Sequence, residues 1–291
     1  MARRSSRRID SRAVGLDIAL AAARFLTGRE NLHYGLWEGL EVNAGNLGRA
    51  QEAYTERLFA FAGLDDGRPR RILDIGGGAG ETARKLLALG HEVEIVIPSE
   101  VLAARCRENA PAARVHECRF EDFASDERFD ICLFSESFQY IPPRIALEKA
   151  AALLTEGGEI VISDCFRSPD YRKENEEVVV GGGHRIERYR EALVDLGLEV
   201  LAEEDITRAV APSVEIEQDF YNVVGFAISR IDRELRERKP WLRRSLAALL
   251  RLFIDERRRR RLDQRLNHRT RTAENFTRNN IYLMTRLRPP A

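Results

Sequence analysis

The stretch that decides the fold is Ile72-Leu73-Asp74-Ile75-Gly76-Gly77-Gly78-Ala79-Gly80. A short apolar run that ends at a cluster of glycines is typical of a buried strand followed by a turn into a helix. Glycines allow a tight turn and let a ligand approach the backbone, and the first turn of the next helix presents unpaired N–H groups. The carboxyl end of a parallel strand is also where open α/β sheets bind ligands. We therefore expect a cofactor site here, although dinucleotide-binding proteins use a similar turn.

Short apolar runs and helical stretches alternate on both sides of this segment, from residue 70 to about residue 204. Strands are expected at 71–75, 93–97, 130–134, 159–163 and 199–203, and helices at 81–89, 100–109, 145–154 and 186–196. This alternation predicts βαβ units and a parallel sheet with helices on both faces. The fold class is therefore α/β.

The rest of the chain divides into three parts. Residues 1–69 are predicted to be a helical lid, with apolar residues at helical spacing over 19–26 and 50–61. Residues 205–279 are polar, rich in arginine and predicted to be a helical insertion that caps the sheet, and residues 280–291 are expected to form a final strand of the sheet.

Four motifs in this order resemble the class I S-adenosylmethionine (SAM)-dependent methyltransferases. The acid directly before the glycine-rich turn resembles their first motif, and the segments 129–137, 153–164 and 188–200 resemble their fourth strand, their fifth strand and their last helix and sixth strand. The resemblance implies a Rossmann-like, seven-stranded, mainly parallel sheet whose last strand is antiparallel. It also implies SAM as the cofactor and methyl transfer to a small-molecule substrate, expected to be an apolar natural product or lipid-like metabolite.

The resemblance assigns five residues of the glycine-rich segment to the methionine half of SAM: Asp74, Gly76, Gly77, Gly78 and Gly80. The aromatic residues Tyr34 and Trp37 resemble a segment that covers the cofactor in small-molecule methyltransferases. An aromatic face attracts a sulfonium cation, and a lid excludes water. The alternative is that Tyr34 and Trp37 simply pack the amino-terminal block onto the sheet.

Two positions depart from the family pattern. Ile97 stands where the family has an acid that holds the ribose, and Arg119 stands where it has an acid near the adenine; a slip of two or three residues would bring Glu121 or Asp122 to the second position. A hydrogen bond to a charged acceptor contributes about 1.5–3 kcal/mol, so these differences matter for cofactor affinity. They motivate a second hypothesis, a protein with a methyltransferase fold that performs other chemistry or acts as a binding or scaffold subunit.

Methyl transfer dictates few residue types, because it needs proximity, orientation and sometimes a base. Gln139 follows the fourth strand, near a position where many relatives have histidine, and it can orient a substrate without acting as a base. Glu136 and His33 are further catalytic candidates, and Glu136 is also expected to contact the cofactor. His184 follows three glycines and is expected to lie in a mobile surface loop.

The charge is distributed unevenly. The chain has 47 basic and 47 acidic residues, which excludes a uniformly charged protein, yet residues 230–271 hold 16 basic and 6 acidic residues, a local excess of 16 − 6 = 10 positive charges. Residues 241–254 are predicted to form an amphipathic helix. It can pack Leu246, Leu249, Leu250 and Phe253 on the domain, lie on a membrane surface near a lipid-like substrate, or bind an anionic partner. Nucleic acid is disfavoured, because aromatic and basic residues do not interleave as in RNA-binding modules.

The four cysteines lie in separate segments without a C-x-x-C pair, so we expect reduced thiols and no metal site. The amino-terminal apolar stretch is interrupted by Asp17 and Arg24, which argues against a signal sequence, and no run is long enough to span a bilayer. The expected location is the cytoplasm, and the oligomeric state is left open.

Overall fold

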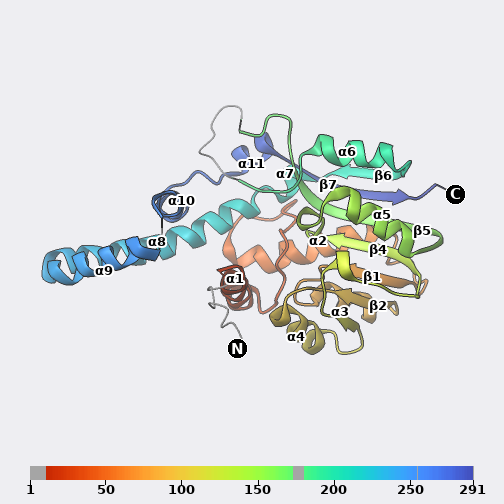
Figure 1. Cartoon of the computed structure of the whole chain (residues 1–291), viewed down its shortest axis with the longest axis horizontal. Helices are drawn as coiled ribbons and strands as arrows, with labels where there is room; N and C mark the ends of the chain where they lie inside the picture. The colour runs from red at the N-terminus through yellow and green to blue at the C-terminus, as the bar shows by residue number, and fades with distance from the viewer. Residues whose placement is uncertain (1–10, 173–179, 254, 291) are drawn as a thin grey trace, which may run out of the picture.

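Seven strands form one sheet in the order β3-β2-β1-β4-β5-β7-β6 (Figure 1). The computed structural model describes residues 11–172, 180–253 and 255–290. The strands are β1 (Arg71–Ile75), β2 (Glu92–Val96), β3 (Arg114–His116), β4 (Phe129–Ser135), β5 (Leu154–Arg167), β6 (Glu199–Asp205) and β7 (Asn280–Arg288). Every pair is parallel except the two that β7 makes, with β5 and with β6. The predicted mainly parallel sheet with an antiparallel last strand is confirmed.

Helices cover both faces of the sheet and extend beyond one side of it (Figure 1). They are α1 (Ser11–Thr27), α2 (Leu47–Ala62), α3 (Glu81–Ala88), α4 (Glu100–Asn109), α5 (Pro143–Leu153), α6 (Ile186–Asp195), α7 (Thr207–Val210), α8 (Ser213–Arg238), α9 (Pro240–Phe253), α10 (Glu256–Asn267) and α11 (Ala273–Asn279). Short 3-10 turns, η1 (Ala44–Asn46), η2 (Phe120–Asp122) and η3 (Phe138–Tyr140), complete the chain.

Alternate residues of the central strands belong to two different layers of the hydrophobic core. On β1, Ile72 packs in the layer of α2, α3 and α4, whereas Leu73 packs in the layer of α5 and α6. Successive strand residues point to opposite faces, and both faces are buried, so the middle of each central strand is mostly apolar. Asp74 is a buried acid between two apolar residues of β1.

The predicted strands and helices of the core are all present, with ends that move by a few residues. The exception is β3, which the sequence did not reveal because Arg114-Val115-His116 is three residues long, lies at the sheet edge and has one apolar side chain. The α4 helix begins at Glu100, as expected.

The insertion between β6 and β7 is helical, but most of it is not a cap over the sheet. Its first turns pack on the body through Val214 and Ile216, and then α8 leads away from the sheet (Figure 1). Leu246 and Leu249, which were expected to be buried on the domain in one interpretation, are exposed. The side chains of Leu250 and Phe253 lie outside the described residues. Within the described part of the chain, no helix has the length and apolar character that crossing a membrane requires.

Candidate cofactor and active site

A cleft with a volume of about 1070 Å³ opens at the carboxyl ends of β1, β2 and β4. The chain proceeds from β1 to β2 and β3 on one side and returns to β4 on the other, so the cleft lies at the point where the strand order reverses. This is the expected ligand site of an open α/β sheet. Gly15, Leu16 and Ala19 of α1 line the cleft as well, so the first described helix forms one of its walls.

The glycine-rich turn forms the floor of the cleft, and glycine is required at two positions. Gly76 has a φ of 78°, and a Cβ there would lie 2.4 Å from the Cβ of Ser137. A Cβ on Gly77 would lie 2.5 Å from Oδ2 of Asp74. Gly78 differs, because its φ is 55° but a Cβ would have no heavy atom within 4 Å. The turn therefore leaves open space next to Gly78, whereas Gly76 and Gly77 pack closely against Ser137 and Asp74. All three glycines line the cleft.

Asp74 is a buried carboxyl group that lines this cleft. Its Oδ2 has no hydrogen-bond partner among the described residues. Burial raises the pKa of Asp74 to about 7. A buried acceptor without a partner is costly, so this side chain is set to receive a donor from a ligand.

Glu136 is a second carboxyl group on the cleft, directly after β4. Its φ of 55° is uncommon for a residue other than glycine and is a form of local strain that often marks functional sites. Its Oε1 accepts hydrogen bonds from the N–H of Tyr34 at 2.7 Å and from the hydroxyl of Tyr282 at 2.7 Å. Burial raises the pKa of Glu136 to about 7, even though these two hydrogen bonds act to lower it.

A buried chain of hydroxyl groups supports Glu136 from behind. The Tyr282 hydroxyl lies 2.9 Å from the Tyr54 hydroxyl, which lies 2.6 Å from Oγ of Ser163. These residues come from β7, α2 and β5, so three elements fix one carboxylate. No local pattern in the sequence predicted this network, although the tyrosine within β7 is a signal of it.

His33 lines the cleft and is held by backbone and ring contacts. Its Nδ1 donates to the carbonyl oxygen of Tyr34 at 2.8 Å, and its ring stacks on that of Tyr54 with centroids 4.6 Å apart. Burial lowers the pKa of His33 to about 4. At neutral pH the ring is therefore uncharged and a weak base, which leaves Glu136 better matched to proton transfer.

Five other predicted site residues do not line the cleft. Tyr34 packs its ring 5.8 Å from that of Phe276, and the indole N–H of Trp37 donates to Ser213. Their side chains pack the amino-terminal block onto the body, as the alternative interpretation stated. Gln139 donates its backbone N–H to Asp164, and Asp122 is exposed. Gly80 packs against α4, because a Cβ there would lie 2.9 Å from Cα of Cys106.

The two residues that depart from the expected family pattern, Ile97 and Arg119, both line the cleft. Ile97 lines the cleft at the end of β2 and donates its N–H to His116. Arg119 and Glu121 both line the cleft and form an ion pair. Of the two acids that were candidates for the position near the adenine, Glu121 is therefore better placed than Asp122.

His184, which was expected to lie in a mobile surface loop, is half-buried and makes hydrogen bonds to neighbouring segments. Its Nε2 lies 2.8 Å from the carbonyl oxygen of Ile141, and its own carbonyl accepts the N–H of Arg167. A Cβ on Gly183 would lie 1.7 Å from the carbonyl oxygen of Cys165, so the glycine lets the loop pack directly on β5. His184 is a structural contact to the loop that follows β4.

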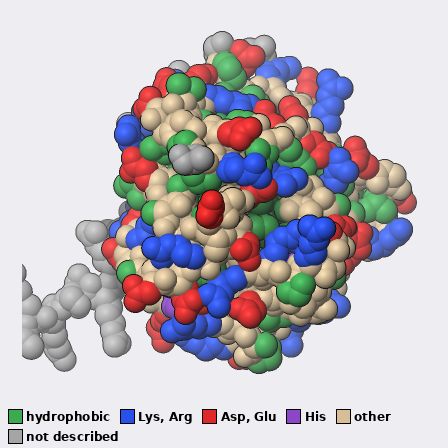
Figure 2. Space-filling view, turned by 90° about the vertical axis from the view of Figure 1, so that its right-hand side faces the viewer, with side chains coloured by type: hydrophobic (Ala, Val, Ile, Leu, Met, Phe, Trp, Pro, Cys, Tyr) green, Lys and Arg blue, Asp and Glu red, His purple; other side chains and the backbone are tan. Residues whose placement is uncertain are grey.

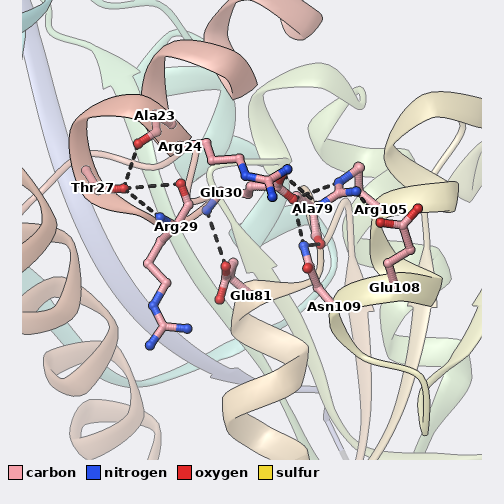
Figure 3. Close-up of polar contacts among 10 residues, drawn as sticks. All are labelled: Ala23, Arg24, Thr27, Arg29, Glu30, Ala79, Glu81, Arg105, Glu108 and Asn109. Carbon is pink, nitrogen blue, oxygen red and sulfur yellow. Dashed lines mark hydrogen bonds and ion pairs between the residues drawn. The ribbon is translucent and has the colours of Figure 1, made fainter.

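Glu30 anchors the end of α1 to the glycine-rich turn and was not predicted (Figure 3). Its carboxylate accepts two hydrogen bonds of 2.8 Å from Arg105 and one of 2.8 Å from Asn109. Asn109 also donates to the carbonyl oxygen of Ala79 in the turn at 2.9 Å. Burial opposes ionisation of Glu30, but Arg105 and Asn109 hold its pKa below the usual value. This buried, bidentate pair fixes the segment that leads from α1 into the cleft.

Residues 47–203, more than half of the chain, match the family model described as a methyltransferase domain. The chain belongs to this methyltransferase family. The predicted methyltransferase family and the predicted Rossmann-like sheet are confirmed.

Individual relatives agree with this assignment. An uncharacterized methyltransferase of Staphylococcus carnosus (strain TM300) is 30% identical over 128 residues, which cover 42% of this chain and 58% of the relative. The match therefore spans less than two thirds of that relative. The structure of the cyclase SpnF is similar with a TM-score of 0.64 at 17% identity, over 96% of this chain and 95% of the other. Geranyl diphosphate C-methyltransferase from Streptomyces coelicolor A3(2) is similar with a TM-score of 0.61 at 16% identity, over 94% and 92%.

The residues present fit the methionine end of SAM better than its ribose end. The open turn around Gly78 can admit a ligand, and the partnerless Oδ2 of Asp74 can accept from an ammonium group. Three of the acids that line the cleft form ion pairs with arginines: Glu30 with Arg105, Glu81 with Arg84 and Glu121 with Arg119. The other two acids on the cleft, Asp74 and Glu136, can attract a cation. At the ribose end, Ile97 offers apolar contact only.

Asp74→Asn is expected to make the SAM-free protein more stable at alkaline pH and to weaken SAM binding. The pKa of Asp74 is raised to about 7, so the stability of the folded state is complete below the ordinary pKa and is lost as pH rises through about 7. The asparagine variant lacks this loss, which amounts to at most about 4 kcal/mol. Losing a charged acceptor costs about 1.5–3 kcal/mol of SAM binding, roughly 10-fold or more.

Thermal unfolding from about pH 5 to 8.5, together with calorimetry with SAM, measures both effects. Asp126→Asn, at an exposed acid in the loop before β4, is the control and should change neither. If the variant and the wild type lose stability in parallel as pH rises, Asp74 is not the group responsible.

Proposed function

We propose that this protein transfers the methyl group of SAM to a small, apolar, natural-product or lipid-like acceptor, and that Glu136 takes up the proton which the acceptor loses. The observation that carries the proposal is the Glu136 carboxylate, which lies on the cleft with a pKa near 7 and is held from behind by Tyr34 and Tyr282. A general base works best when its pKa lies near the working pH.

The positions of Asp74, the glycine-rich turn and Glu136 in the cleft indicate a different role for each. When bound, SAM supplies a methyl group on a cationic sulfur. Asp74 and the backbone of the glycine-rich turn would hold the amino-acid end of the cofactor. Tyr34 and Tyr282 both donate to Oε1 of Glu136. Its Oε2 is therefore the atom that would accept the proton from the substrate.

The size and walls of the cleft support a second, apolar ligand beside the cofactor. Ligand pockets typically measure about 300–1,000 Å³, and this cleft is at the upper end of that range. Apolar side chains from several elements line it: Leu16, Leu32, Val96, Leu102, Phe120 and Ile141. Such walls exclude water and favour an acceptor with little hydrogen-bonding surface.

Calorimetry and a product assay test this function. We expect SAM and S-adenosylhomocysteine to bind, and S-adenosylhomocysteine to be released from SAM with members of an apolar panel such as geranyl diphosphate, fatty acids and hydrophobic phenols. Sarcosine serves as the polar control. Release with the polar control alone would contradict an apolar acceptor, and absence of SAM binding would contradict methyl transfer itself.

The second candidate is a methyltransferase fold that performs other chemistry. Ile97 at the ribose position is the specific observation in its favour, and the similar structure of the cyclase SpnF is described by a reaction other than methyl transfer. This candidate predicts that SAM binds without S-adenosylhomocysteine release from any acceptor, or does not bind at all.

A further inference from the structure

The helices α8, α9 and α10 form an arm that extends away from the sheet (Figure 1). We call the described residues 220–253 and 255–267 the helical arm. Asp232 on α8 pairs with Arg243 on α9 at 2.7 Å, which joins these two helices. A Cβ on Gly225 would lie 2.1 Å from the carbonyl oxygen of Leu266, so α10 packs closely on α8. The arm is therefore an ordered unit whose helices contact one another.

Large apolar side chains are exposed on the arm. Trp241 is 67% exposed, Phe226 is 72% exposed and Leu249 is 51% exposed. Val223, Ile231 and Leu246 are exposed as well. Single exposed apolar residues are ordinary, but a concentration of them along one projecting unit indicates a surface that contacts something apolar.

The same arm carries a strong positive charge. The α9 helix has three arginines and no acid, and α10 has six arginines against two acids, so the two helices contribute 3 and 6 − 2 = 4 positive charges. The body differs, because basic and acidic side chains are interspersed on the face that Figure 2 shows. In the body such side chains form mutual pairs, for example Arg190 with Glu203.

The two properties of the arm together favour one class of partner. A second copy of the arm would bring arginine-rich helices together and repel them. A nucleic acid would match the charge but not the leucine, isoleucine and tryptophan side chains. A bilayer with anionic lipids offers negative headgroups to the arginines and acyl chains to the apolar residues, as amphipathic basic helices require. We propose that the helical arm docks on the surface of a membrane that contains anionic lipids.

Vesicle sedimentation with the full-length protein tests this proposal. With vesicles of equal parts phosphatidylglycerol and phosphatidylcholine at low salt, most of the protein is expected in the pellet. With phosphatidylcholine alone, or at high salt, binding is expected to fall by about tenfold or more, because screening removes the electrostatic contribution.

Two pairs of variants locate the surface. Trp241→Ser combined with Leu249→Ser should lower vesicle binding by about tenfold. The matched control is Val194→Ser, at a residue that is 81% exposed on α6, and it should bind like the wild type. Arg244→Gln combined with Arg261→Gln should bind only at lower salt than the wild type, whereas Arg188→Gln on α6 should not differ from it. Far-UV circular dichroism and SAM affinity are measured for each variant to show that the body is intact.

Three results would overturn the proposal. The protein could stay in the supernatant with anionic vesicles at low salt. It could sediment equally well after the Trp241 and Leu249 substitutions. Alternatively, analytical ultracentrifugation could show a dimer that these substitutions dissociate, without vesicle binding, in which case a second copy covers the arm.

Discussion

Replacing Glu136 by glutamine is expected to lower kcat by about 10²–10⁴-fold, with SAM affinity changed by less than about tenfold. Glutamine keeps the shape of the side chain and can still accept from Tyr34 and Tyr282, but it cannot take up a proton at neutral pH. The wild-type rate should rise with pH up to about 7 and then level off, because the base must be ionised and its pKa is about 7. The rate of the variant should not show this rise.

A companion variant separates proton transfer from a structural effect. Tyr282→Phe removes a hydrogen bond that lowers the pKa of Glu136, so the midpoint of the rate profile should move to higher pH. The measurement is S-adenosylhomocysteine release with the best acceptor from the apolar panel. A Glu136→Gln variant with more than a third of the wild-type kcat would remove Glu136 as the base.

The arrangement of the core followed from its sequence because local pattern and global fold agree there. The strand 71–75 and the glycines after it carry their own signals, namely an apolar run, a turn and a helix start, and β1 has the predicted bounds. The same holds for α4, whose start at Glu100 is capped by Ser99. Pattern alone could not place the ends of β5, which extends beyond the predicted strand on both sides. At its start Leu154 pairs with Phe129 of β4, and at its end β7 pairs with it as far as Arg167.

The parts of the site that the sequence did not reveal depend on residues far apart in the chain. Glu30 contacts Arg105 and Asn109, which follow it by 75 and 79 residues, and Tyr54 contacts Tyr282 across 228 residues. No local spacing marks such pairs. In the same way, the amphipathic pattern of α9 identifies its apolar residues but does not specify what covers them, which is why burial of Leu246 and Leu249 on the domain was only one of the alternatives.

The largest effect on cofactor binding is expected from Gly78→Arg, which should abolish the calorimetric signal with SAM and weaken binding by at least about 100-fold. A Cβ at Gly78 meets no heavy atom within 4 Å, so a side chain there begins in the open space beside the glycine-rich turn, where the cofactor is expected. The positive φ of 55° adds a backbone cost of roughly 1–2 kcal/mol, which alone would lower stability without blocking a site.

Gly63→Arg is the matched control for that backbone cost. Gly63 ends α2 with a φ of 64°, has nothing within 4 Å of a Cβ, and is not among the residues that line the cleft. Both variants should lose a similar amount of thermal stability, but only Gly78→Arg should lose SAM binding. Equal loss of binding in both variants would mean that strain is responsible, and retained binding in Gly78→Arg would mean that the cofactor lies elsewhere. Because the control carries the same strain without the same position, the comparison isolates the contact between the glycine-rich turn and the cofactor.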